Sequence, residues 1–215
     1  MKLPSGRNPW LSIWTSPRAT VREILDTDPA YMVLPLTALA GFFESLGRAS
    51  WKNLGDHVSL PLILLFCAIG GPLGGLLGLY VGSAVLSWTG SWIDGLASPR
   101  QIRAAMAWSS VPFICAGILY LPQLVLVGKG LFISQRPAIE VGSIKFAILG
   151  LSILQMIAGI WSFVVFWICL GETQRFSTWK ALVNVLLIIV LAIVFILILG
   201  MVAAVLGSIL FGKAR

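Results

Sequence analysis

The chain has 215 residues, of which 58% are hydrophobic and only 11% are charged, and its mean hydropathy is +0.96. A soluble domain carries about 25% charged residues, so this composition excludes a soluble fold. The formal net charge of +7 fits Lys and Arg side chains that flank membrane spans. We expect no nucleic-acid partner, because no basic cluster with an aromatic platform accompanies this charge.

Five apolar stretches predict an all-α, polytopic membrane helix bundle. A helical span needs about 20 mostly apolar residues. The stretches are about 29–46, 60–88, 104–127, 146–170 and 181–211. We therefore divide the chain into an N-terminal interfacial segment, residues 1–28, and a five-span membrane domain, residues 29–215.

The residues before the first span predict a short amphipathic helix that lies on the membrane surface. Trp10 and Trp14 are one turn apart, as anchors at the level of the lipid headgroups often are. Arg18 and Arg22 lie on a different helix face from the apolar residues. Those apolar residues are Val21, Ile24 and Leu25. The alternative is a loosely ordered polar lead-in, because so short a helix is marginal on its own.

Ionisable residues close to the first three predicted spans are the candidates for a polar, ion or ligand site. They are Glu44, Arg48, Asp56 and Asp94. Glu44 and Arg48 are four residues apart at the end of the first predicted span, a spacing that pairs them on one helix face. Since an ionisable residue inside a membrane is a functional candidate, two interpretations stay open: a structural ion pair, or an ion or substrate site.

The second predicted span contains a ridge of glycines and a proline. Gly70, Gly74, Gly78 and Gly82 recur at every fourth position, which places them along one helix face where another backbone can approach closely. Pro72 removes one helical hydrogen bond and predicts a kink. We interpret the stretch as one tilted, kinked span; the alternative is a broken helix that lines a cavity. The spacing does not separate packing within one chain from packing between two copies.

The third predicted span should bend at Pro112, and residues 98–101 before it form a capping-box sequence. With five spans, the N-terminal segment and the loops after the second and fourth spans lie on the same side of the membrane. We place that side and the N-terminus in the cytoplasm, and the C-terminus outside, because basic residues cluster before the first span. The predicted cytoplasmic interface consists of Trp10, Trp14, Arg18, Arg22, Arg100, Arg103, Arg175 and Lys180.

The sequence contains none of the catalytic or metal-binding motifs that we sought. Its one histidine and its three cysteines are dispersed, and Cys67, Cys115 and Cys169 each lie in a different predicted span, as small core residues do. The patterns HExxH, GxSxG and GxxxxGK[ST] are missing. We therefore expect no enzyme activity, no metal and no cofactor.

Several short segments match a known family in their order and spacing. Asp56 stands shortly before Pro61 and a glycine-rich second span follows, while residues 108–112 read Trp-Ser-Ser-Val-Pro. Residues 98–105, the region of Trp161 and residues 177–181 complete the set, together with Asn8-Pro9-Trp10 and Ser16-Pro17 at the start. The chain resembles the Yip family, the Ypt/Rab-interacting five-span membrane proteins. The opening segment is similar to that of bacterial members.

The resemblance implies a short, prokaryotic-type member of a trafficking-related family, located in the bacterial inner membrane. Eukaryotic relatives have a long N-terminal region tied to Rab binding, whereas about 28 residues precede the first span here, so we do not expect a Rab-type GTPase partner. We expect a non-enzymatic scaffold or adaptor that engages membrane lipids, other membrane proteins or further copies of itself through its basic cytoplasmic segments. The alternative is a small transporter or channel with a site near the kinked second span and Glu44.

Overall fold

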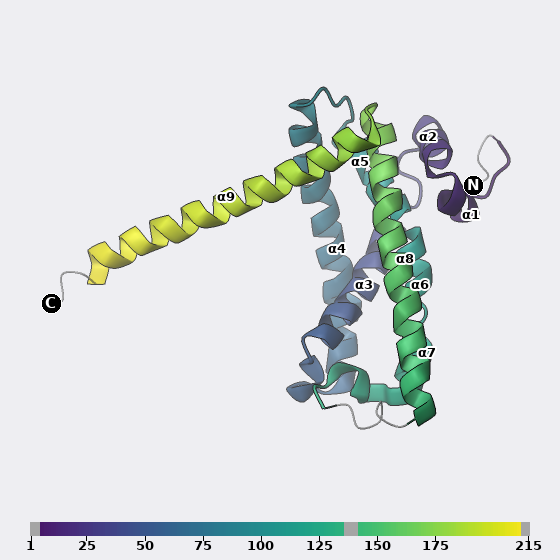
Figure 1. Ribbon diagram of the computed structural model, residues 1–215, viewed down its shortest axis with the longest axis vertical. Helices are drawn as coiled ribbons and strands as arrows, with labels where there is room; N and C mark the ends of the chain where they lie inside the picture. The colour runs from purple at the N-terminus through teal and green to yellow at the C-terminus, as the bar shows by residue number, and fades with distance from the viewer. Residues whose placement is uncertain (1–4, 136–141, 212–215) are drawn as a thin grey trace.

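A computed structural model describes residues 5–135 and 142–211, and within these residues it contains helices and no strand (Figure 1). The first half of the chain forms α1 (Pro9–Thr15), α2 (Pro17–Thr27), α3 (Val33–Trp51), the short η1 (Leu54–Asp56) and α4 (Leu60–Ser91). The second half forms α5 (Pro99–Ser109), α6 (Val111–Gly117), α7 (Tyr120–Val127), η2 (Gly128–Phe132), α8 (Gly142–Gln174) and α9 (Thr178–Phe211). The prediction of an all-α protein is confirmed for the described residues.

Four segments among the described residues are long and apolar enough to cross a membrane: Leu60–Ser91, Pro99–Phe132, Gly142–Gln174 and Thr178–Ala203. They contain the second to fourth predicted spans and residues 181–203 of the fifth. The first predicted span is not among them, because Glu44 and Arg48 lower the hydropathy of α3. Its bounds also differ, since residues 28–32 form turns and Met32 has a left-handed backbone, so the helix begins at Val33 and continues to Trp51.

The long helices α4 and α8 stand upright in Figure 1; α3 lies between them, and α6 and α7 overlap with α8 in this view. The short helices α1 and α2 lie against one end of this bundle. From the same end, α9 leaves at a wide angle. Only the first turns of α9 pack on the bundle, where Ala181 and Asn184 are fully buried; its apolar side chains from Ile193 to Val202 are exposed.

The closest helix contact is between α3 and α4, and it uses different glycines from those predicted. A Cβ on Gly41 would lie 3.1 Å from the Cα of Gly75, and one on Gly71 would lie 2.7 Å from the carbonyl oxygen of Gly41. By contrast, a Cβ on Gly70, Gly74 or Gly78 would meet nothing within 4 Å. The predicted ridge is therefore wrong as an intrachain packing surface at these three positions. Only Gly82 contacts another element, through a methyl group of Met106.

Proline has different consequences in the second and third predicted spans. Helix α4 is continuous through Pro72, so the broken-helix alternative is wrong. At Pro112 the third segment does break, because α5 ends at Ser109 and α6 starts at Val111. The hydroxyl of Ser162 on α8 fills this break: it donates to the carbonyl of Ser109 (2.7 Å) and accepts from the amide of Phe113 (3.1 Å). It thereby replaces the backbone hydrogen bond between residues four apart.

The N-terminal helices pack on the bundle through the face that we predicted to enter the membrane. Val21 and Ile24 of α2 are fully buried. In α1, Trp10 packs edge to face on the buried Trp108, with ring centroids 5.9 Å apart. Helix α2 is thus present, and its apolar face is covered by protein and is not free to enter lipid.

Candidate functional site

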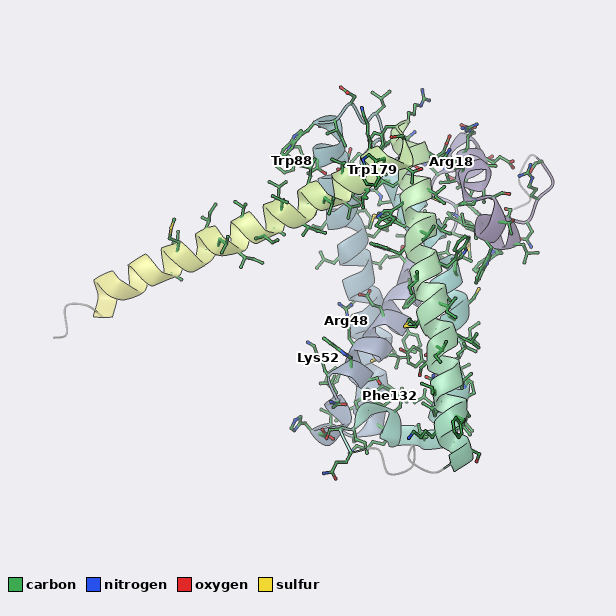
Figure 2. All side chains as sticks on the ribbon, viewed as in Figure 1. Arg18, Arg48, Lys52, Trp88, Phe132 and Trp179 are labelled. Atoms are coloured by element: carbon green, nitrogen blue, oxygen red, sulfur yellow. The ribbon has the colours of Figure 1, made fainter. Side chains whose placement is uncertain are left out.

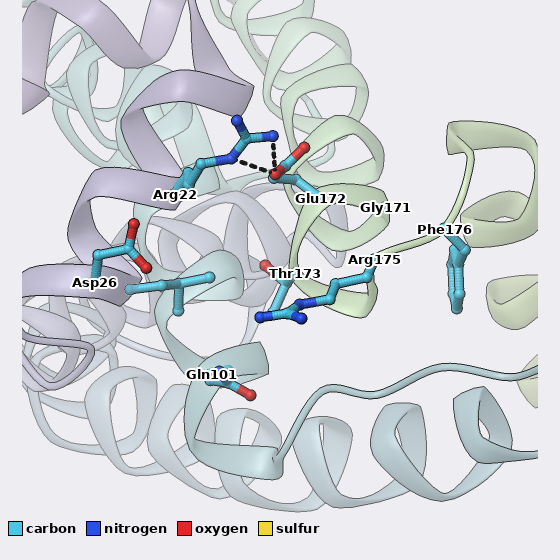
Figure 3. A pocket seen from close by; sticks show the side chains of 9 residues that line it. Arg22, Asp26, Gln101, Gly171, Glu172, Thr173, Arg175 and Phe176 are labelled. Atoms are coloured by element: carbon cyan, nitrogen blue, oxygen red, sulfur yellow. Dashed lines mark hydrogen bonds and ion pairs between the residues drawn. The ribbon is translucent and has the colours of Figure 1, made fainter.

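A polar cavity of about 600 Å³ lies at the end of the bundle where α2, α5 and the C-terminal turn of α8 meet. Figure 3 shows it from close by. Arg22 bridges the elements, because its Nε donates to the Glu172 carboxylate at 2.7 Å, and Thr173 lines the wall beside it. Side chains of both charge signs contribute: Arg22, Arg175, Asp26 and Glu172. The cavity can therefore hold a polar group or a mixed-charge segment.

Further cations surround this cavity. Arg18 donates to the hydroxyl of Thr178 at the start of α9 (2.6 Å), and Lys180 pairs with Asp94 (3.5 Å). Arg103 lies over the ring of Tyr80, 4.7 Å from its centroid. Arg100 is exposed. Figure 2 shows Arg18 and Trp179 at this end of the molecule, together with Trp88. We call this end the rim; it consists of the cavity and the surrounding residues Arg18, Arg100, Arg103 and Lys180.

A fully buried polar network anchors the rim to α4. Gln174, Asn184 and Thr89 are all 0% exposed. The side-chain amides of Gln174 and Asn184 both donate to the carbonyl of Leu86 (3.1 Å each), and Thr89 donates to Asn184 at 2.6 Å. Gln174 also accepts from the amide of Ala97 at 3.1 Å. Because these buried groups have partners, the network stabilises the junction of α4, α8 and α9.

A second cavity, of about 360 Å³, lies along α4 between α3 and the break that separates α5 from α6. We call it the groove; it is lined by Thr37, Glu44, Arg48, Gly74, Gly78 and Ser110, among others. The predicted pair is present, with Arg48 3.3 Å from Glu44, and each side chain is more than half exposed. Thr37 is 7% exposed, and its hydroxyl has no hydrogen-bond partner.

The four candidate ionisable residues do not form one site. Asp56 lies in η1, before α4, where its carboxylate accepts from the amide of Ser134 at 3.1 Å. Hydrogen bonds from the side chain and backbone of Ser134 hold the pKa of Asp56 below its ordinary value. Asp94 lies beyond the other end of α4 and pairs with Lys180. Glu44 lines the groove whereas Asp94 pairs with Lys180, so these two carboxylates lie apart.

Comparison with family models places this fold among known proteins. The model of the Yip1 domain matches residues 11–211, which is most of the chain. The chain belongs to the Yip1 family. No curated protein and no solved structure matches it. The expected resemblance is thus confirmed, and the protein is an integral membrane protein of this family.

In this Yip1 domain, Arg22 and Arg175 of the predicted interface line the rim cavity and Arg18 contacts the start of α9, whereas the two tryptophans face inward. Trp10 packs on the core, and Trp14 lines an apolar cavity against α6 and α8. Sequence reasoning missed Gln174, Asn184 and Ser162. Asn184 carried a usable signal, because a lone amide inside a long apolar run needs a buried partner.

Among the described residues of the Yip1 domain, no three His, Cys, Asp or Glu side chains gather where they could hold a metal ion. The three cysteines are unpaired, and Cys67 and Cys169 are buried. The rim and the groove expose charged and hydrogen-bonding side chains.

Proposed function

We propose that this Yip1-domain protein is a non-enzymatic membrane adaptor whose rim engages a partner protein or anionic lipid headgroups on the cytoplasmic side. The observation that carries the proposal is the rim cavity, which is built from three separate elements and exposes charges of both signs. Such a surface suits recognition, because complementary charges on two binding partners favour the correct partner and steer its approach. Membership of a trafficking-related family agrees with this role.

We propose that α3 is a fifth membrane span. Its 19 residues make a helix of about 28 Å, which is close to the ~30 Å thickness of the hydrocarbon layer. It packs along α4 through Gly41 and Gly75, and contact between small residues is what holds helices together in lipid. The polar residues that lower its hydropathy, Glu44 and Arg48, face the groove.

Five spans place the rim and the C-terminus on opposite sides of the membrane. The basic residues of the rim support a cytoplasmic N-terminus in a bacterial inner membrane. Helices α1 and α2 then lie at the interface by packing on the bundle. Cysteine labelling of intact cells tests the orientation: single cysteines at Arg175 and Lys52 should react with an impermeant reagent from opposite sides.

A photo-crosslinking amino acid at Arg175 tests the adaptor role in the native membrane. Arg175 is exposed and lines the rim cavity, so a bound protein lies within reach. We expect one discrete protein adduct, or a lipid adduct enriched in anionic headgroups, and loss of either on Arg100→Glu. Lys52, at the opposite end, is the control position. Equal adducts at both positions, or none at Arg175, contradict the proposal.

One observation favours a second function, a small transporter or channel: the Glu44 carboxylate and its partner Arg48 face a cavity beside α4. Ionisable side chains inside a membrane commonly mark substrate pathways. This function predicts solute or ion flux into proteoliposomes that falls on Glu44→Gln. No flux across a broad panel of solutes excludes it and leaves the adaptor proposal unaffected.

A further inference from the structure

We propose that the groove binds the headgroup of a zwitterionic phospholipid with a primary ammonium, such as phosphatidylethanolamine. The site is separate from the rim and does not depend on the adaptor role. It concerns the groove of the second candidate function, but it requires binding only, not flux.

The register between α3 and α4 determines the depth of the groove. Thr37 lies against Gly75, and the hydroxyl of Ser45 donates to the carbonyl of Cys67 at 3.3 Å, so the two helices run antiparallel. Glu44 therefore lies opposite residues near Ala68. The middle of α4 is at residues 75–76, which is about 11 Å further along the helix at 1.5 Å per residue.

This depth places Glu44 inside the hydrocarbon layer and Arg48, one helical turn further along α3, at its edge. The layer extends about 15 Å to each side of the membrane centre, and α4 crosses it. Figure 2 accordingly shows Arg48 part-way along the bundle, between the end with Trp88 and the end with Phe132. Glu44 and Arg48 are 54% and 57% exposed, so the protein itself covers them only in part. Half-covered charges at this depth are costly unless a polar ligand completes their surroundings.

The chemistry of the lining selects a ligand that carries both charges. An ammonium group can donate up to three hydrogen bonds to the Glu44 carboxylate, while the planar guanidinium of Arg48 matches the oxygens of a phosphate. Thr37 adds a hydroxyl without a partner in the wall. The volume of about 360 Å³ lies within the ordinary range of small-molecule sites, roughly 300–1,000 Å³.

The glycines provide the room for the headgroup. Gly74 and Gly78 line the groove, and a Cβ on either would meet nothing within 4 Å. Their backbone therefore lines one wall of the groove without side chains that would fill it. A molecule that reaches this depth arrives through the bilayer, and a phospholipid brings its own zwitterion and an acyl tail for the surrounding apolar surface. A second copy of the chain is the other occupant that the experiment below tests.

Native mass spectrometry of the full-length protein with equimolar phosphatidylethanolamine, phosphatidylcholine and phosphatidylglycerol tests the proposal. We expect one retained phosphatidylethanolamine, preferred about tenfold over each of the others. Phosphatidylcholine lacks the N–H donors for Glu44, and phosphatidylglycerol lacks the cation. Glu44→Gln and Arg48→Gln should each remove the preference.

Gly78→Leu tests the site without altering a charge, because its side chain enters open space and fills the groove. Gly150→Leu is the matched control, on an exposed position of α8 where a Cβ also meets nothing within 4 Å. We expect loss of the bound lipid in the first variant and full retention in the second, with equal melting temperatures. Equal retention of the three lipids by the unaltered protein overturns the proposal. Unchanged binding in Gly78→Leu, or a lipid-free dimer that Gly78→Leu dissociates, also overturns it.

Discussion

Two polar regions beside α4 differ in how their hydrogen bonds are satisfied. In the buried network that anchors the rim to α4, Gln174 and Asn184 are completely buried, and each hydrogen-bonds a backbone or side-chain partner. In the groove, Glu44 and Arg48 are half-exposed, and the hydroxyl of Thr37 has no partner. A satisfied buried network stabilises one arrangement, whereas an incomplete one is ready to accept a ligand. We therefore assign the buried network to stability and the groove to binding.

The largest effect should come from breaking the satisfied network. Gln174→Leu leaves the amide of Ala97 without its acceptor and removes a donor to Leu86 in a buried setting. We expect a loss of about 3 kcal/mol in the free energy of unfolding, measured by denaturant titration in mixed micelles. Gln135→Leu, the same change at an exposed glutamine, should cost little. Equal costs would mean that the network does not hold the junction together.

Alanine substitutions at the glycines of α4 should distinguish the helix face that packs on α3 from the face that meets open space. Gly75→Ala places a Cβ 2.9 Å from the carbonyl oxygen of Thr37 and 3.0 Å from the Cα of Gly41, so we expect a loss of about 2 kcal/mol. Gly74→Ala, one residue earlier, meets open space and should gain up to about 1 kcal/mol from lower chain entropy in the unfolded state. The reverse order in unfolding measurements would place the α3–α4 contact on the other face.

Ser162 belongs with the satisfied region, although it lies at the break in the third membrane segment. Ser162→Ala removes the hydroxyl that joins Phe113 and Ser109, so we expect a loss of about 1–2 kcal/mol, measured by the same titration. The exposed Ser152 on the same helix provides the control, and its alanine variant should be near neutral. If Ser162→Ala left the free energy of unfolding unchanged, the break between α5 and α6 would not depend on the Ser162 hydroxyl.

The smallest effect on stability should come from Asp56. Its carboxylate lies outside the membrane spans and accepts its hydrogen bonds from the protein. Hydrogen bonds from Ser134 lower its pKa in the folded protein. The contact therefore stabilises the protein above the ordinary carboxyl pKa and loses its effect as pH falls through the lowered value. The melting temperature of the unaltered protein should slightly exceed that of Asp56→Asn at neutral pH, and the gap should close in acid. A gap that widens in acid would reverse the assignment.

Local sequence patterns were sufficient for the features that depend on a few neighbouring residues. The capping box at residues 98–101 and the pairing of Glu44 with Arg48 appear as predicted, and the bend expected at Pro112 takes the form of a break between α5 and α6. Each depends on contacts within one helical turn or on a missing N–H group. The long apolar runs likewise predicted α4, α8 and α9, because every backbone polar group in a membrane needs a partner within its own helix.

The packed face and the depth of the charges were decided by the tertiary structure. The second span contains two interleaved sets of glycines, and both repeat every four residues: Gly70, Gly74 and Gly78 in one, Gly71 and Gly75 in the other. Spacing cannot choose between them, because the choice depends on where Gly41 of α3 meets α4. The same antiparallel register sets Glu44 beside α4 near Ala68, about 11 Å from the middle of that helix. Whether a segment forms a helix depends on neighbouring residues. The register between two helices, and the depth of their side chains, are set only when the helices pack together.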